Sequence, residues 1–192
     1  MENLKFRPLR ADEIEVRVGQ VRQNGVMLLL YKDARCDMNI LDETVGPLNW
    51  QRTHSRENAN CTVSIYDDQK NQWISKEDTG TKSNTEEEKG LASDSFKRAC
   101  VNWGIGRELY TAPFIWVSSR GCNINAANGA ARCYDRFAVE AIITSDDKQI
   151  LALSIINQTA GKRVFVMDKR TPEQKEAAAE DDAAHVNNIR ET

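Results

Sequence analysis

The segment Ser93–Tyr110, SDSFKRACVNWGIGRELY, says more about the fold than any other part of the chain. Its apolar residues recur at the i, i+3, i+4 and i+7 spacing of a single helix face: Phe96, Ala99, Cys100 and Trp103. This spacing predicts an amphipathic helix that buries one stripe against the body of the protein.

Two adjacent cations, Lys97 and Arg98, lie beside this stripe. A helix anchored by its apolar face would hold them at a fixed height above the surface, where they could meet a row of phosphates. Gly104 and Gly106 can adopt a positive φ, so we expect them to end the helix. A lysine–arginine pair on a solvated helix face is also common in proteins that bind no nucleic acid, so that interpretation stays open.

The charge of the chain is unevenly distributed. The 192 residues carry a net charge of −3, and a length of this order predicts one domain with a substantial core. Residues 171–192 hold six acidic and two basic residues, so the remaining 1–170 have a net charge of +1. Any basic surface must therefore be local. We expect 171–192 to be an acidic tail, either a frayed helix or disordered, that keeps the protein soluble or competes for a basic site.

The sequence argues against several protein classes. No apolar run reaches the length of a membrane span, and the start of the chain has no apolar signal region, so we expect a cytoplasmic protein that does not bind membranes. The five cysteines form no CxxC pair, which argues against a zinc site and favours reduced, mostly buried thiols.

The remaining pattern predicts an α+β fold, a twisted antiparallel sheet packed on one long helix and shorter ones. We expect short helices at Ala11–Val18 and Cys36–Val45, with a polar loop at Glu77–Asn84 before a capping box at Thr85–Glu88. The segment Cys122–Arg132 reads as a loop or insertion. The expected strands are Val26–Tyr31, Asn49–His54, Asn60–Tyr66, Gln72–Lys76, Ala112–Ser118, Arg136–Thr144, Ile150–Thr159 and Arg163–Met167.

Nucleotide and metal motifs give little support to an enzyme. Thr79–Ser83 lacks both glycines of a P-loop, and Gly104-Ile105-Gly106 follows a helix and not a strand, so we expect no nucleotide cofactor. A metal-dependent nuclease is the enzyme alternative, with Asp78 and the Glu87-x-Lys89 pattern as its carboxylates and lysine. A capping box explains the glutamates equally well, so we expect no metal.

The string KGLASDSFKRACVNWGIGRELY resembles the helix signature of the Rad fifty-two family of single-strand annealing proteins, in its phage (Sak-like) branch and the related DdrA-like proteins. The shared elements are a KG start, SD-x-x-KRA, an aromatic–glycine pair and GR-x-LY. An earlier stretch, RPLRADEIEVRV followed by LLLYKDARCDMNILDETVGPLNWQ, resembles the first half of the same fold. The matching residues are Arg17, Tyr31, Arg35, Leu41, Gly46 and Trp50.

This resemblance, over about residues 6 to 168, implies an ATP-independent protein that binds single-stranded DNA and anneals complementary strands in recombination or repair. It implies a ring of identical subunits and a phage or prophage origin in a bacterial host. The implied DNA contacts are Lys97 and Arg98 on the groove floor, Arg17 on a first helix, Arg35 at the Y-x-x-x-R turn and Lys70 at an outer hairpin tip. Lys70 is equally well explained as a solvated turn lysine, and Arg35 as a residue that holds its turn.

Two further expectations complete this interpretation. Trp50 and Trp103 are better explained as packing residues than as base-stacking ones. A single-strand binding protein or an exonuclease is a candidate partner, whereas recombinase loading is doubtful because the chain ends soon after the matched region. A DNA-end protector that does not anneal would need the same groove, so the sequence leaves it open.

Overall fold

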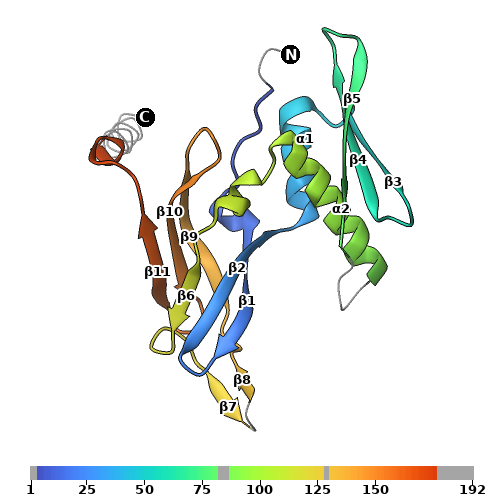
Figure 1. The fold of residues 1–192 in the computed structure, drawn as a ribbon. Coiled ribbons are helices and arrows are strands. Elements are labelled where there is room, and N and C mark those ends of the chain that lie inside the picture. Colours follow the sequence, from blue (N-terminus) through green and yellow to red (C-terminus); the bar gives the residue numbers. More distant parts are fainter. Residues whose placement is uncertain (1–3, 82–86, 128–129, 177–192) are drawn as a thin grey trace, which may run out of the picture.

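A computed structural model describes residues 4–81, 87–127 and 130–176 of the chain. It shows an α+β fold in which all strand ladders between described residues are antiparallel (Figure 1). None of the described helices is long and apolar enough to cross a membrane. In the predicted acidic tail, residues 172–176 are helical, and the part from 177 onward lies outside the described residues.

The larger layer is a six-stranded sheet in the order β11-β10-β9-β1-β2-β6. Its strands are β1 (Ile14–Arg22), β2 (Gly25–Lys32), β6 (Ile115–Ser118), β9 (Phe137–Thr144), β10 (Ile150–Asn157) and β11 (Lys162–Asp168). Apolar side chains such as Leu28, Ile115 and Ile155 are buried on its inner face. The sequence predicts strands at all these places except β1.

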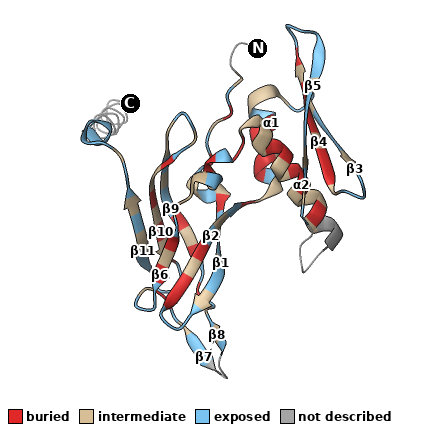
Figure 2. Ribbon diagram, in the orientation of Figure 1, coloured by how far each residue is buried: buried red, intermediate tan, exposed pale blue. Residues whose placement is uncertain are grey.

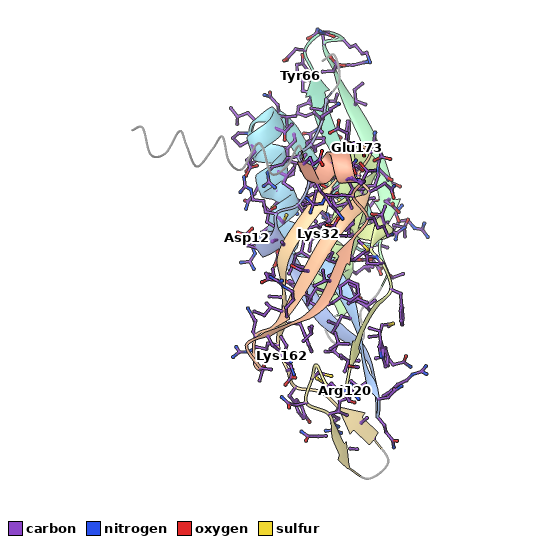
Figure 3. All side chains as sticks on the ribbon, turned by 90° about the vertical axis from the view of Figure 1, so that its left-hand side faces the viewer. Asp12, Lys32, Tyr66, Arg120, Lys162 and Glu173 are labelled. Atoms are coloured by element: carbon purple, nitrogen blue, oxygen red, sulfur yellow. The ribbon has the colours of Figure 1, made fainter. Side chains whose placement is uncertain are left out.

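The two edges of this sheet approach each other. The Nζ atom of Lys162, at the start of β11, donates to the carbonyl of Arg120 just after β6 at 2.6 Å (Figure 3). A Cβ atom on Gly121 would lie 3.3 Å from Cγ1 of Val164 in β11. The sheet is therefore nearly closed, and its edges β6 and β11 face one another.

The smaller layer joins two helices to a three-stranded sheet. The helices are α1 (Ala34–Val45) and α2 (Glu87–Trp103), and the strands are β3 (Trp50–Ser55), β4 (Asn60–Asp67) and β5 (Gln72–Thr79). Figure 2 shows buried residues along both β4 and α2. The predicted stripe is confirmed, because Phe96, Ala99 and Cys100 are fully buried.

Both tryptophans expected to pack do so. The ring of Trp50 stacks on Phe96 with centroids 6.1 Å apart. The Nε1 atom of Trp103 donates to the carbonyl of Val63 at 3.1 Å, which ties the end of α2 to β4. All five cysteines are free thiols, and every one except Cys133 is buried.

The expected helix at Ala11–Val18 is wrong. A 3₁₀ turn, η1 (Ala11–Glu13), leads directly into β1. Ile14, Val16 and Val18 alternate with polar residues and pair against β2, a period of two that β-branched side chains favour in strands. Arg17 therefore lies on a strand and not on a helix.

The expected end of the long helix is confirmed, whereas two other boundaries differ from those expected. Helix α2 ends at Trp103, and the separate 3₁₀ turn η2 (Arg107–Thr111) follows the two glycines. Gly104 and Gly106, with φ of +100° and +68°, make the break. The strand β5 continues to Thr79 where a loop was expected, and a small hairpin of β7 (Asn125–Ala127) and β8 (Ala130–Arg132) lies within the predicted loop. The capping box at Thr85–Glu88 falls on residues that lie mostly outside the described part.

Candidate nucleic-acid interface

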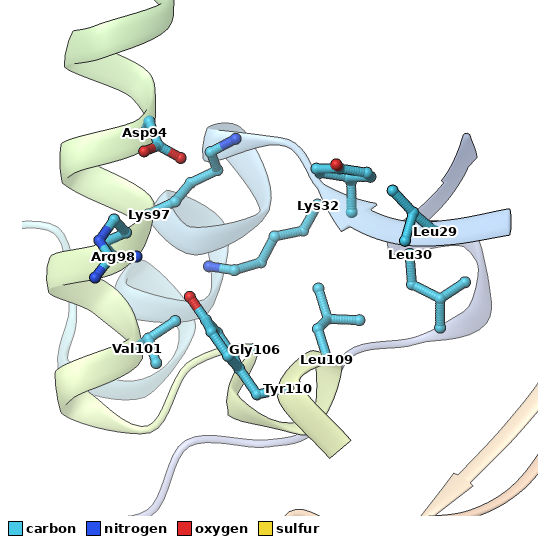
Figure 4. A pocket seen from close by; sticks show the side chains of 11 residues that line it. Leu29, Leu30, Lys32, Asp94, Lys97, Arg98, Val101, Gly106, Leu109 and Tyr110 are labelled. Atoms are coloured by element: carbon cyan, nitrogen blue, oxygen red, sulfur yellow. The ribbon is translucent and has the colours of Figure 1, made fainter. Parts of the chain in front are cut away.

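A pocket of about 270 Å³ lies between α2, the end of β2 and η2, and we call it the α2–β2 pocket (Figure 4). It brings together residues from three segments that are distant in the sequence. Its lining residues are Leu29, Leu30, Tyr31, Lys32, Asp94, Lys97, Arg98, Val101, Gly106, Leu109 and Tyr110. Much of the lining is apolar, and α2 contributes the cations Lys97 and Arg98.

Lys97 and Arg98 differ in their partners. The Nε atom of Arg98 donates to Oδ1 of Asp78 in β5 at 3.2 Å, and the Arg98 side chain is 42% exposed. Among the described residues, no carboxylate lies within 4 Å of the Lys97 ammonium group. Lys97 is thus the cation of this pair that offers an unpaired charge to a ligand.

Arg17 lies on the strand next to the pocket. Its register partner on β2 is Leu29, and its guanidinium group stacks over the ring of Tyr31 at 4.8 Å. Both Leu29 and Tyr31 line the α2–β2 pocket. The Nη2 atom of Arg17 also contacts Glu15 at 2.5 Å, and the Arg17 side chain is 60% exposed. Arg17 therefore lies beside the pocket without lining it.

Arg35 lies in the first turn of α1, next to a carboxylate that also senses the charge of Lys97. Its side chain and its backbone N–H both bond the carboxylate of Asp33, the N-cap residue of the helix. These bonds hold the pKa of Asp33 below its usual range, and the positive charge of Lys97 contributes in the same direction. Arg35 therefore orders the turn between β2 and α1, and its side chain is 81% exposed toward solvent.

Lys70 does not join the other cations. It lies in the turn between β4 and β5, where its Nζ atom is 3.6 Å from Oδ2 of Asp67. Figure 1 shows this hairpin tip well away from the end of β2. The structure thus brings Arg17, Arg35, Lys97 and Arg98 to one region and leaves Lys70 outside it.

A buried ion pair lies beneath the pocket. Lys32, at the end of β2, donates to Oδ1 of Asp37 in α1, and the two side chains are only 5% and 0% exposed. Burial raises the pKa of Asp37 to about 6, although the lysine favours the charged form. No described group bonds its second oxygen, Oδ2. The sequence does not single out Lys32, because a lysine that ends a strand is usually solvated.

The turn η2 is held firmly from its inner side. The fully buried carboxylate of Glu108 accepts a hydrogen bond from the backbone N–H of Leu9 at 2.5 Å. The hydroxyl of Thr111 donates to the carbonyl of Glu108 and accepts from the N–H of Ile150. In a 3₁₀ helix residues i and i+3 share a face, so Tyr110 and Arg107 are left on the outer one.

Two cations near the pocket act as helix caps. The guanidinium group of Arg107 donates to the carbonyls of Val101 and Asn102 at 3.0 and 3.3 Å, and Lys76 from β5 donates to Asn102 at 2.8 Å. They neutralise the negative end of α2, where carbonyl groups have no helical partner. Neither was singled out from the sequence as a site residue.

The residues of the nuclease alternative are only partly described. Asp78 accepts hydrogen bonds from Arg98 and from Asn102, at 3.2 and 3.4 Å. The side chains of Glu87, Glu88 and Lys89 lie outside the described part of the chain. No cluster of three metal-ligating side chains occurs among the described residues.

Comparison of the chain with family models, with curated proteins and with solved structures found no match. The geometry of the α2–β2 pocket and its surrounding cations therefore carries the functional argument.

Proposed function

We propose that the protein binds single-stranded DNA and anneals complementary strands without ATP. One observation carries this proposal: Lys97 and Arg98 line one pocket, and two more exposed cations lie beside it, Arg17 over the lining residue Tyr31 and Arg35 on Asp33. Lys97 has no carboxylate partner among the described residues. The resemblance of two segments to the Rad fifty-two family, in its phage branch, supports the same function and a role in recombination or repair in a bacterial cell. Annealing breaks no covalent bond, so the protein needs no catalytic residue.

The ion pairs around the pocket are compatible with this function. Each of the three arginines contacts one carboxylate, and both side chains of each pair are at least partly exposed. The arginines are Arg17, Arg35 and Arg98. Exposed pairs of this kind are weak in water, so a phosphate can displace the carboxylate and take the cation. Lys97 needs no such exchange, and we expect it to make the first contact.

Binding should therefore depend on phosphate neutralisation and not on base sequence. Each neutralised phosphate releases bound counterions, so the logarithm of the affinity should fall steeply with the logarithm of the salt concentration. Fluorescence anisotropy with labelled oligonucleotides of different sequence would measure this. A flat salt response, or strong preference for one sequence, would contradict the proposal.

We also propose that the protein works as a ring of identical subunits. A body with a net charge of +1 over residues 1–170 binds one strand weakly, and a ring repeats the cations along that strand and raises the avidity. The apolar edge strands β6 and β11 face each other within one subunit, so they are poorly placed for subunit contacts. Among the described strands, β3 pairs with β4 alone and forms one edge of the three-stranded sheet, so this edge is the better candidate for a head-to-tail interface.

Mass photometry at micromolar concentration would test the ring. We expect a closed assembly of many subunits, or a short helical arc. A single species at the monomer mass of 21.7 kDa, with and without DNA, would contradict the ring and leave DNA binding to be judged separately.

A further inference from the structure

Exposed aromatic rings line the α2–β2 pocket and the hollow beside it. Tyr110 is 67% exposed and Tyr31 37%, and both line the pocket. Phe114 is 71% exposed and lines a second hollow of about 300 Å³. The two hollows share Leu29, Leu30 and Leu109, so the three rings belong to one continuous surface, which we call the aromatic surface.

The local structure fixes these rings without burying them. Tyr110 lies on the outer side of η2, whose inner side is anchored by Glu108. Phe114 stacks on Trp116 of β6, with ring centroids 6.4 Å apart and planes inclined by 9°. Single exposed apolar side chains are ordinary, whereas several on one continuous surface indicate a binding site.

Charge accompanies the rings in the same pocket. Lys97, Arg98 and Tyr110 line it (Figure 4). Tyr31 lines the same pocket. A nucleotide of single-stranded DNA presents the same combination, a flat apolar base and an anionic phosphate one sugar away. The volume of about 270 Å³ is slightly below the range of pockets for drug-sized ligands, which suits a group as small as one base.

We propose that the aromatic surface binds the faces of DNA bases by stacking, with Tyr110 as the principal contact, while Lys97 holds the adjacent phosphate. This inference rests on the proposed function. It adds the DNA base to the phosphate as a group that the site binds. Stacking uses the face of a base and leaves its Watson–Crick edge free, so it is compatible with annealing. It also tolerates any sequence, because every base has a π face.

A second copy of the chain is the competing occupant of this surface. An apolar neighbour docked here would cover Lys97, which has no carboxylate partner among the described residues. Burying an unpaired charge is costly, whereas a phosphate would satisfy it. The charge therefore favours DNA over a protein interface.

The test compares a thymidine oligonucleotide with an abasic oligonucleotide of the same length, which keeps the phosphates and lacks the bases. At fixed salt, we expect the wild-type protein to bind the thymidine polymer at least about fivefold more tightly. The variant Tyr110→Ala should lose most of this preference, and Tyr110→Phe should retain it. The matched control is Tyr134→Ala, because Tyr134 is 69% exposed and does not line either hollow.

Each outcome has a distinct meaning. Equal affinity of the wild-type protein for both polymers, with steep salt dependence, would overturn base stacking and leave the proposed DNA binding intact. A change of oligomer mass in Tyr110→Ala without a change in base preference would assign the surface to a subunit contact and overturn the inference. Failure of both polymers to bind would instead contradict the proposed function itself.

Discussion

The side chain of Lys32 runs across the face of Gly106, and a Cβ atom placed on Gly106 would lie 2.7 Å from its Cδ atom. The glycine also has a φ of +68°, a conformation that other residues rarely adopt. Gly106 therefore caps the start of η2 and leaves room for the buried lysine. This relationship gives a physical reason for a glycine before the Arg107-x-Leu109-Tyr110 motif.

Gly106→Ala should destabilise the protein more than Gly161→Ala. Gly161 has a nearly equal φ of +62°, and a Cβ atom placed on it would have no neighbour within 4 Å, so both variants share the conformational cost of roughly 1–2 kcal/mol. Only Gly106→Ala adds the collision with Lys32, worth about 1–3 kcal/mol more. Urea unfolding would measure the difference in the free energy of unfolding. Equal losses in the two variants would show that the Lys32 side chain moves aside at little cost.

Breaking the pair between Lys32 and Asp37 should be costly. Asp37→Ala would leave a lysine buried without its partner, and we expect a loss of about 3–5 kcal/mol in the free energy of unfolding. The double variant Lys32→Met, Asp37→Leu should lose much less, because it removes both charges. If the double variant is as unstable as Asp37→Ala, the apolar replacement does not fit and the ion pair is not the cause.

The titration of Asp37 gives a pH-dependent signature. Its pKa of about 6 in the folded protein is above the 3.8 of an ordinary aspartate, so the folded chain binds more protons than the unfolded chain between those two values. Its contribution to stability is therefore greatest at low pH and falls as the pH rises through that window. NMR of the carboxyl carbon should give a midpoint near the raised value, and a midpoint near that of an ordinary aspartate would show that the group is solvated.

Single substitutions on α2 should separate binding from folding. Lys97→Ala and Arg98→Ala remove side chains outside the buried stripe, so we expect weaker DNA binding with nearly unchanged stability. Phe96→Ala empties a fully buried site and should cost about 3–5 kcal/mol. Lys169→Ala, an exposed lysine just after β11, is the control cation. Charge variants that unfold while the remaining folded protein binds normally would refute the assignment.

The local sequence pattern predicts those helices and strands whose apolar residues recur with the period of the element itself. The stripe of α2 and the strands β2, β4, β9 and β10 follow from spacing alone. The prediction for β1 is wrong because Asp12 and Glu15 imitate a helix start, whereas pairing with β2 and β9 decides its conformation. The local pattern does not predict contacts between distant segments, and these contacts decide the conformation of β1.

The candidate site shows the same limit. Lys97 and Arg98 can be found from the sequence because they are neighbours in one helix. The buried Lys32 cannot be found, because its burial depends on Asp37 and on Gly106 from separate elements. Tyr110 is visible in a motif, but its exposure depends on the anchoring of Glu108 at Leu9.

The most direct test of the central claim is the annealing of complementary oligonucleotides, followed by fluorescence energy transfer between labelled strands, without ATP and without Mg²⁺. We predict that the protein accelerates annealing under these conditions and that Lys97→Ala reduces the rate, while Lys169→Ala does not. Salt-sensitive DNA binding with no acceleration would contradict annealing and favour an end-binding protein. Cleavage of the strands on adding Mg²⁺ or Mn²⁺, abolished by Asp78→Ala, would contradict the account in favour of a nuclease.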